Sequence, residues 1–135
     1  MTTCTRRLEW DAAHRVLRHE SKCAHLHGHR YVAEITCLGI LDSVGRVIDF
    51  GVVKEVVGRW IDDRWDHGTL LNVEDESLLR WLQDNEQKHY VVEGEPTAEV
   101  LAGLLKDVAA RELSRYGVAV VAVTVHETPN CWASA

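Results

Sequence analysis

A short segment near the start of the chain gathers side chains that could bind a metal or transfer protons. Between Cys23 and Tyr31 the sequence places one thiol and three imidazoles. Residues 27–38 are rich in β-branched and aromatic types, which predicts a strand. Because side chains in a strand repeat every two residues, His27 and His29 would project from the same face. Two such imidazoles supply two of the three protein ligands that an open, catalytic zinc site usually has.

A third candidate ligand, His14, ends the strand that is predicted just before this segment. Residues 8–14 alternate between apolar and polar types, and His14 falls on the apolar face with Leu8, Trp10 and Ala12. A buried imidazole without a partner is costly, and a metal is the simplest partner for three of them. The alternatives are a solvent-exposed His-x-His pair and three histidines that are satisfied as ordinary structural residues.

Cys23 lies four residues before His27 and has three possible roles. As a fourth zinc ligand it would close the site and make it structural. As a free thiol beside Lys22 and near the metal it would favour the thiolate form. As a small buried hydrophobe it would take no part in chemistry.

Two carboxylates complete the set of candidates. Asp66 precedes His67 and could orient its imidazole and raise its basicity, giving a general acid near neutral pH. A charge pair at a helix end is the simpler interpretation. Glu127 follows a hydrophobic strand and could accept two parallel N–H bonds from a planar, guanidine-like edge, as in guanine or a pterin. A solvated glutamate at a strand end is the alternative.

The composition limits the class of protein. A chain of 135 residues suits one domain, 1–135, with its own core. The net charge of −6 argues against a general nucleic-acid surface, and no apolar run is long enough to span a membrane. No apolar signal segment follows Met1, and the four cysteines are irregularly spaced. We therefore expect a cytoplasmic protein with free thiols and no disulfide framework.

Strands and helices must position these residues. Hydrophobic alternation predicts strands over 8–14, 27–38 and 118–125, with an extended return over 46–50 that completes an antiparallel ribbon. Helical periodicity predicts helices over 52–61, over 75–83 and after Thr97, with Asp49 and Thr97 as N-caps. We interpret residues 66–72 as a loop. This order predicts an α+β fold in which helices pack on one face of an antiparallel sheet.

Taken together, the motifs resemble the 6-pyruvoyltetrahydropterin synthase and 6-carboxytetrahydropterin synthase family. The matching segments follow the family's order and cover nearly the whole chain: Trp10-Asp11-Ala12-Ala13-His14-Arg15, Cys23-x3-His27-Gly28-His29, Val47-Ile48-Asp49-Phe50, Asp66-His67, Pro96-Thr97-Ala98-Glu99 and His126-Glu127-Thr128. The resemblance implies a T-fold (tunnelling fold) subunit. It also implies a homo-oligomer, usually a hexamer of two trimers, with active sites at subunit boundaries.

The resemblance implies roles for the candidate residues. It assigns His14, His27 and His29 to Zn2+, which would hold the side chain of the substrate. Cys23 would be the thiolate general base, and His67, oriented by Asp66, the partner acid/base. Glu127 would anchor the amino and ring N–H edge of the pterin, with Thr97 and Glu99 as helpers.

The short spacing between Cys23 and His27 resembles the carboxytetrahydropterin branch of the family. That branch converts 7,8-dihydroneopterin triphosphate to 6-carboxy-5,6,7,8-tetrahydropterin with release of acetaldehyde and triphosphate, on the route to queuosine and other 7-deazapurines. The triphosphate would meet nearby basic residues or those of a neighbouring subunit; the nearby ones are Arg15, Arg18, Lys22 and Arg30. The alternatives are a pyruvoyl synthase, which eliminates triphosphate only, and a non-catalytic zinc module closed by Cys23. A plain interaction domain would leave Asp66-His67 and Glu127 unexplained.

Overall fold

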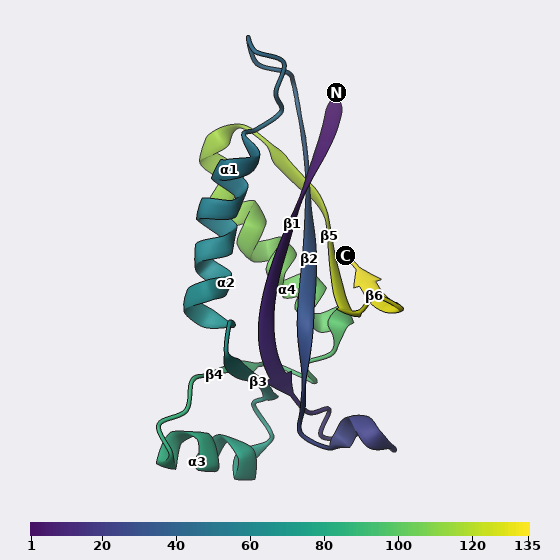
Figure 1. The fold of residues 1–135 in the computed structure, drawn as a ribbon, viewed down its shortest axis with the longest axis vertical. Helices are drawn as coiled ribbons and strands as arrows, with labels where there is room; N and C mark the ends of the chain where they lie inside the picture. Colours follow the sequence, from purple (N-terminus) through teal and green to yellow (C-terminus); the bar gives the residue numbers. More distant parts are fainter.

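The computed structural model describes residues 1–135, which form one six-stranded sheet with the order β4-β3-β1-β2-β5-β6 (Figure 1). The strands are β1 (Thr2–His14), β2 (His27–Gly39), β3 (Gly68–Asn72), β4 (His89–Val92), β5 (Ala119–Thr128) and β6 (Cys131–Ser134). The helices are α1 (Phe50–Val53), α2 (Arg59–Arg64), α3 (Glu76–Asp84) and α4 (Ala98–Leu113), with short 3-10 turns at Lys22–Ala24 and Ser114–Tyr116. A π-helical turn, Lys54–Gly58, joins α1 to α2 in one continuous run.

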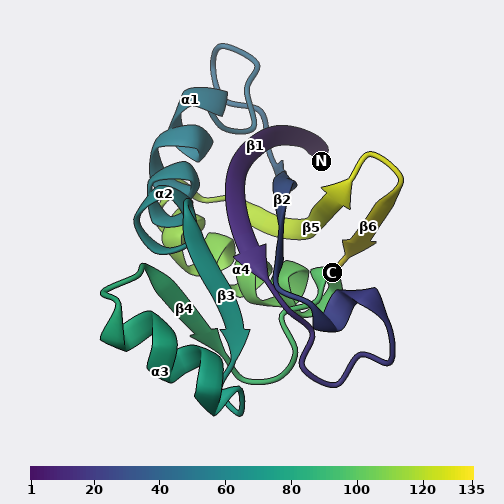
Figure 2. The same ribbon diagram turned by 60° about the horizontal axis from the view of Figure 1, so that its bottom comes forward.

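The long hairpin of β1 and β2 forms the centre of the sheet. The two strands pair antiparallel over their whole length, with Leu8 opposite Ala33 and His14 opposite His27. β5 pairs antiparallel with the free edge of β2, and β6 extends the sheet beyond it. Figure 2 shows how strongly β1 curves along this surface. The structure confirms the three strands predicted from alternation.

One face of this hairpin is covered by a single layer that consists of the α1–α2 run and α4 (Figure 1). Val53, Val57 and Ile61 are buried one helical turn apart, as the predicted stripe requires. Leu101 and Leu105 of α4 bury against the same core. Both predicted N-caps are confirmed: the Asp49 carboxylate accepts the Gly51 amide at 2.7 Å, and the Thr97 hydroxyl accepts the Val100 amide at 3.3 Å.

The interpretation of 66–72 as a loop was wrong. Residues 68–72 form β3, which pairs parallel with the end of β1 and with β4, a strand that was not predicted. All five residues of β3 are buried, because Leu70 faces the main core and Leu71 faces α3. The α+β class is confirmed, but the sheet is mixed and not purely antiparallel. In addition, α3 packs on the face of β3 and β4 opposite to that covered by the longer helices.

The expected extended return over 46–50 was also wrong. The Asp42 carboxylate accepts the amides of Val44 and Arg46, both at 2.9 Å, which closes a tight loop. Phe50 then already opens α1, so no third strand joins the ribbon at this point. Local side-chain hydrogen bonds of this kind compete with strand pairing.

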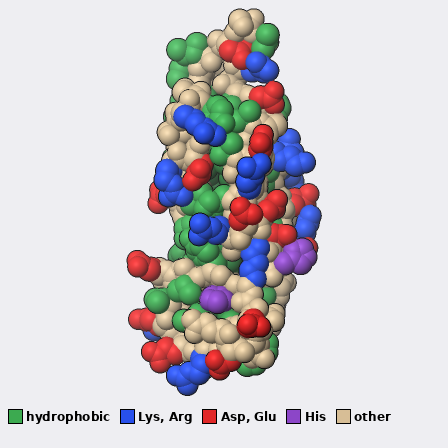
Figure 3. Space-filling model, turned by 90° about the vertical axis from the view of Figure 1, so that its left-hand side faces the viewer, with side chains coloured by type: hydrophobic (Ala, Val, Ile, Leu, Met, Phe, Trp, Pro, Cys, Tyr) green, Lys and Arg blue, Asp and Glu red, His purple; other side chains and the backbone are tan.

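No helix has the length and apolar character needed to cross a membrane. On the face drawn in Figure 3, Lys and Arg side chains alternate with Asp and Glu along the molecule.

Candidate metal centre and active site

The three predicted histidine ligands meet where β1 ends and β2 begins. His14 is the last residue of β1 and lies directly opposite His27, the first residue of β2. His29 follows two residues later on the same face. One ring nitrogen of each histidine lies within 4.8 Å of the others. The strand alternation thus predicted this cluster correctly.

Hydrogen bonds to backbone carbonyls fix how two of the rings are turned. Nδ1 of His14 donates to the Pro96 carbonyl at 2.7 Å, and Nδ1 of His27 donates to the His25 carbonyl at 2.6 Å. A carbonyl can only accept, so each Nδ1 carries the proton and each Nε2 keeps a lone pair. The two Nε2 atoms face each other at 3.1 Å.

This arrangement fits a metal ion well. Nε2 of His29 is buried without any hydrogen-bond partner, and the facing lone pairs of His14 and His27 repel each other unless a cation or proton lies between them. Metal-binding histidines usually donate their other N–H to a carbonyl or carboxylate, as His14 and His27 do here. The donor set, three imidazoles, suits zinc and other first-row transition metals.

Burial favours the neutral form, which a metal ligand requires, at His14 and His29. His14 is only 2% exposed. Burial lowers the pKa of His14 to about 4; the Pro96 hydrogen bond opposes this shift, and the neighbouring His27 and His29 add to it. Burial also lowers the pKa of His29, against the opposing charge of Glu127. Tyr31 packs edge-on against His29 with ring centroids 5.4 Å apart and closes the inner side of the cluster.

Glu127 lies beside the histidines, at the end of β5. Its carboxylate oxygens are 4.0 Å from Nε2 of His14 and 4.0 Å from Nε2 of His29. The side chain is 25% exposed, so it borders the cluster and remains open to a ligand. Thr97 and Glu99 open α4 close by; the Thr97 hydroxyl serves the helix cap, and Glu99 is exposed.

Cys23 lies in the connection between β1 and β2. It is a half-buried free thiol in the 3-10 turn Lys22–Ala24. Its sulfur does not belong to the group of ligand atoms that the three histidines form. This geometry leaves the histidine cluster with three protein ligands and disfavours the closed, structural site in which Cys23 would be the fourth.

Asp66 and His67 form a second cluster, separate from the histidines. Nδ1 of His67 donates to the Asp66 carboxylate at 2.8 Å, and the other Asp66 oxygen accepts the Asp11 amide at 3.1 Å. The cluster includes the carboxylate of Asp11. Because Asp11 and His14 are three residues apart on an uninterrupted strand, their side chains point to opposite faces of the sheet. The structure therefore does not bring His67 to the histidine cluster of its own chain.

The local backbone presents His67 to solvent. Its φ angle is +59°, a left-handed conformation that is unusual for a residue other than glycine, and its side chain is 75% exposed. Strained positions of this kind are often found at functional sites. Burial alone would raise the pKa of Asp66, but the hydrogen bonds from His67 and the Asp11 amide, with the charges of His67 and Lys88, lower it overall. Asp66 is therefore a carboxylate that can orient the imidazole.

Most of the basic residues considered for the triphosphate are already paired. Arg15 binds Asp75, Arg18 binds Glu74 and Glu95, and Arg30 binds Asp11 on the opposite face of the sheet. Lys22 is exposed.

Sequence reasoning missed two partners of the site, the Pro96 carbonyl and Glu95. A backbone carbonyl such as that of Pro96 cannot be recognised from a pattern of side chains. The predicted helix start at Pro96-Thr97 was the only sequence signal in this loop.

Comparisons with known proteins agree on one family. The family model described as 6-pyruvoyl tetrahydropterin synthase matches residues 3–135. Proteins named 6-carboxy-5,6,7,8-tetrahydropterin synthase from Rickettsia conorii and Rickettsia felis are 39% and 40% identical, each covering 98% of both chains. A solved structure of an uncharacterized protein from Wolinella succinogenes superposes with a TM-score of 0.86 at 22% identity, covering 99% of this chain and 97% of that one. A Caenorhabditis elegans 6-pyruvoyl tetrahydropterin synthase gives a TM-score of 0.71 at 22% identity, covering 99% and 94%. These two structures support the fold.

Proposed function

This chain belongs to the 6-pyruvoyl tetrahydropterin synthase family, and we propose that it is the lyase that forms 6-carboxy-5,6,7,8-tetrahydropterin. Its substrate would be 7,8-dihydroneopterin triphosphate, and acetaldehyde and triphosphate would be released. The observation that carries this proposal is the cluster of His14, His27 and His29 beside Glu127. The name of the Rickettsia relatives and the short spacing from Cys23 to His27 favour the carboxy product. The reaction would serve queuosine or another 7-deazapurine pathway.

We propose that His14, His27 and His29 hold Zn2+. Support comes from the orphaned Nε2 of His29 and from the two carbonyl-oriented rings whose Nε2 atoms face each other. Bound zinc would supply a Lewis acid that polarises the oxygens of the substrate side chain. Three protein ligands leave a coordination position open for the substrate.

The remaining residues would bind the pterin and move protons. Glu127 would accept two N–H bonds from the pterin edge, and its position next to the histidines would set the side chain of the substrate over the metal. Cys23, as thiolate, would remove a proton from that side chain. Thr97 and Glu99, at the start of α4, would contact the pterin as helpers.

We propose that Asp66 and His67 act on the substrate held by a neighbouring copy of the chain. This proposal rests on the position of the pair, on the sheet face opposite to the histidine cluster of its own chain. A homo-oligomer, a hexamer of two trimers by family resemblance, would bring the two halves together. The four free thiols are in keeping with a cytoplasmic location.

Complementation tests the shared site. Cys23→Ala and His67→Ala should each abolish activity, whereas a co-expressed mixture should recover about a quarter of it, since each required wild-type residue is present at a given site half of the time. No recovery in mixed oligomers would mean that both residues act at a site of the same chain, and a fully active single variant would mean that the replaced residue has no role.

The decisive experiment for the function is product analysis. Zinc-loaded protein is incubated with 7,8-dihydroneopterin triphosphate, and both acetaldehyde and the pterin product are measured. Acetaldehyde together with a carboxypterin is the expected result. Release of triphosphate without acetaldehyde would assign the protein to the pyruvoyl branch. No turnover with zinc fully bound would favour a structural zinc module.

A further inference from the structure

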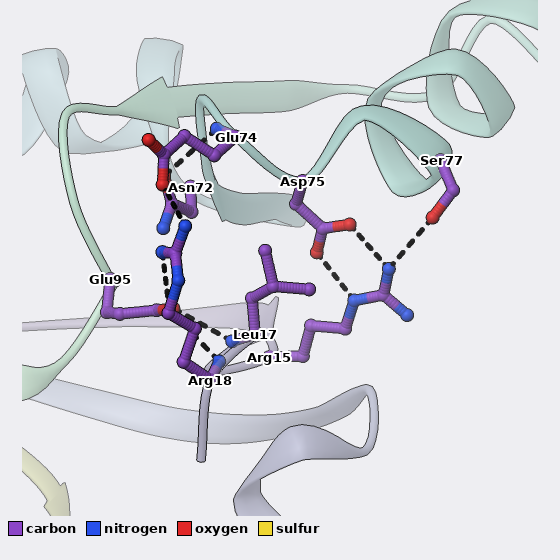
Figure 4. Close-up of polar contacts among 8 residues, drawn as sticks. All are labelled: Arg15, Leu17, Arg18, Asn72, Glu74, Asp75, Ser77 and Glu95. Atoms are coloured by element: carbon purple, nitrogen blue, oxygen red, sulfur yellow. Dashed lines mark hydrogen bonds and ion pairs between the residues drawn. The ribbon is translucent and has the colours of Figure 1, made fainter.

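Carboxylates from two other loops hold the segment that follows β1 (Figure 4). Asp75, in the β3–α3 loop, binds the Arg15 guanidinium through two hydrogen bonds of 2.6 and 2.5 Å. Glu74, beside it, binds only the guanidinium of Arg18 with its side chain. Glu95 reaches the same segment from the β4–α4 loop.

Glu95 differs from the other two carboxylates because it binds the backbone. One oxygen accepts the Leu17 amide at 2.8 Å, and the other accepts the Arg18 amide at 3.1 Å. The Arg18 guanidinium lies 3.5 Å from the second oxygen. Both oxygens therefore accept hydrogen bonds from the loop backbone, so the Glu95 carboxylate holds the loop.

The turn that Glu95 holds is connected directly to Cys23. The His19 amide donates to the Val16 carbonyl at 3.0 Å, which closes the turn that contains the two amides bound by Glu95. The Val16 amide, in turn, donates to the Cys23 carbonyl at 2.9 Å. A displacement of this turn would therefore move the backbone of Cys23 as well.

The residue after Glu95 holds a histidine of the metal cluster. The Pro96 carbonyl accepts Nδ1–H of His14 at 2.7 Å, and the Thr97 hydroxyl caps α4. The Thr97 amide also donates to the Glu95 carbonyl at 2.8 Å, which stiffens this short segment. Two consecutive residues, Glu95 and Pro96, thus bind the loop of Cys23 and the ring of His14.

We infer that Glu95 is a positioning residue for Cys23, which it holds at a fixed place relative to the three histidines. The inference rests on the proposed function only in so far as Cys23 is the general base. A loop held through charge-assisted hydrogen bonds to two amides gives the thiolate one preferred position, and proton transfer depends steeply on such placement. Arg15 and Asp75 anchor the start of the loop independently, so variants of Glu95 are expected to fold.

The test compares Glu95→Gln with Glu74→Gln as the matched control. Both variants remove one charge from the partners of Arg18, but only Glu95→Gln weakens the bonds to the amides of Leu17 and Arg18. Hydrogen–deuterium exchange of these amides should become about 10- to 100-fold faster in Glu95→Gln, because a hydrogen bond to a charged group is lost. Alkylation of Cys23 by iodoacetamide should become faster by a similar factor, while zinc content stays unchanged.

The kinetic constants provide the functional part of the test. In Glu95→Gln, kcat should fall about 10- to 100-fold with KM within about threefold, because the proton-transfer geometry is lost and the pterin contacts remain. Glu95→Asp keeps the charge but moves the carboxylate oxygens away from the loop amides, because the side chain is shorter. It should show the same changes in kcat and KM more weakly, and it replaces Glu95→Gln in the test if that variant does not fold. Glu74→Gln should resemble the wild type.

Two results would overturn the inference. Wild-type exchange at Leu17 and Arg18 together with wild-type kcat in both Glu95 variants would show that the carboxylate does not hold the loop. Equal losses in Glu74→Gln would show that the charge around Arg18 matters, and not the amide bonds. The exchange and alkylation measurements use no substrate, so they decide the role of Glu95 even if the wild-type protein fails to turn over the pterin.

Discussion

Replacing Arg15 by leucine should destabilise the protein strongly and in a pH-dependent manner. The Asp75 carboxylate is 1% exposed and takes two hydrogen bonds from Arg15. Removing one partner of a buried pair typically costs about 3–5 kcal/mol, because the remaining charge stays buried. Here Arg15 is 25% exposed, and the Leu78 amide still bonds to Asp75, so we expect about 2–3 kcal/mol of lost unfolding free energy.

The sign of the pH dependence follows from the carboxylate. The Arg15 hydrogen bond, opposed by burial, lowers the pKa of Asp75 below its ordinary value. A folded-state pKa below the unfolded one stabilises the fold above the unfolded pKa, and this stabilisation disappears as the pH falls through the folded pKa. In Arg15→Leu the buried Asp75 carboxylate has lost its cationic partner, so burial favours its protonated form. The difference in unfolding free energy between the wild type and Arg15→Leu should therefore be largest at neutral pH and should shrink as the pH falls through about 4.

Urea unfolding monitored by circular dichroism, at a fixed protomer concentration, measures the loss of unfolding free energy and its dependence on pH. Arg46→Leu is the matched control, because its partners Asp42 and Asp49 are about half exposed, with side-chain exposures of 42% and 55%. Exposed pairs contribute only about 0–1 kcal/mol. Two results would refute the assignment of Asp75 as a buried, paired carboxylate. One is that Arg15→Leu lowers the free energy of unfolding no more than Arg46→Leu does at neutral pH, and the other is that the loss caused by Arg15→Leu grows towards acid pH.

Three further predictions concern the site and the thiols. His29→Ala should reduce the zinc affinity by at least about tenfold, measured by competition with a chelator, because it removes one of three proposed ligands; unchanged affinity would exclude His29 as a ligand. Asp66→Asn should keep the fold but lower kcat by about 100- to 10,000-fold, since an amide favours the wrong tautomer of His67; a kcat close to wild type would contradict this role. Burial, with the nearby thiol of Cys4, raises the pKa of Cys37 to about 11, so the native protein should be alkylated at exposed Cys131 long before Cys37. Mass spectrometry of the alkylated peptides checks this order.

The fold could be predicted from the sequence where the pattern is long. Alternation over 8–14, 27–38 and 118–125 indicated the three principal strands, and an apolar stripe indicated the helical run that begins after Asp49. The short strands β3 and β4 were not predicted, because neither shows alternation between apolar and polar residues. All residues of β3 are buried, and β4 is a four-residue strand at the edge of the sheet. Their pairing depends on chain segments that are distant in sequence, which no local pattern reveals.

The site was predictable to the extent that it lies on the central hairpin. His14, His27 and His29 are brought together by antiparallel pairing alone, and alternation indicated that Glu127 shares the face of Val123 and Val125. The distance between Cys23 and the histidines depends on a loop held by Glu95, and such a loop has no sequence period. The orientation of His14 depends on a backbone carbonyl, which every residue possesses.

The alternation along β1 also limits how the proposed catalytic residues can cooperate. The strand directs Trp10, Ala12 and His14 towards the helices, and it directs Asp11 to the opposite face, where the Asp11 backbone and carboxylate adjoin Asp66 and His67. The pairing of Ala12 with Gly68 fixes the position of His67 along β1. A chain could bring His67 to its own histidine cluster only by breaking this pairing and the core behind it. If both clusters act on one substrate, as proposed, a second copy of the chain must supply one of them, and the geometry of a single strand would then make assembly a requirement of the chemistry.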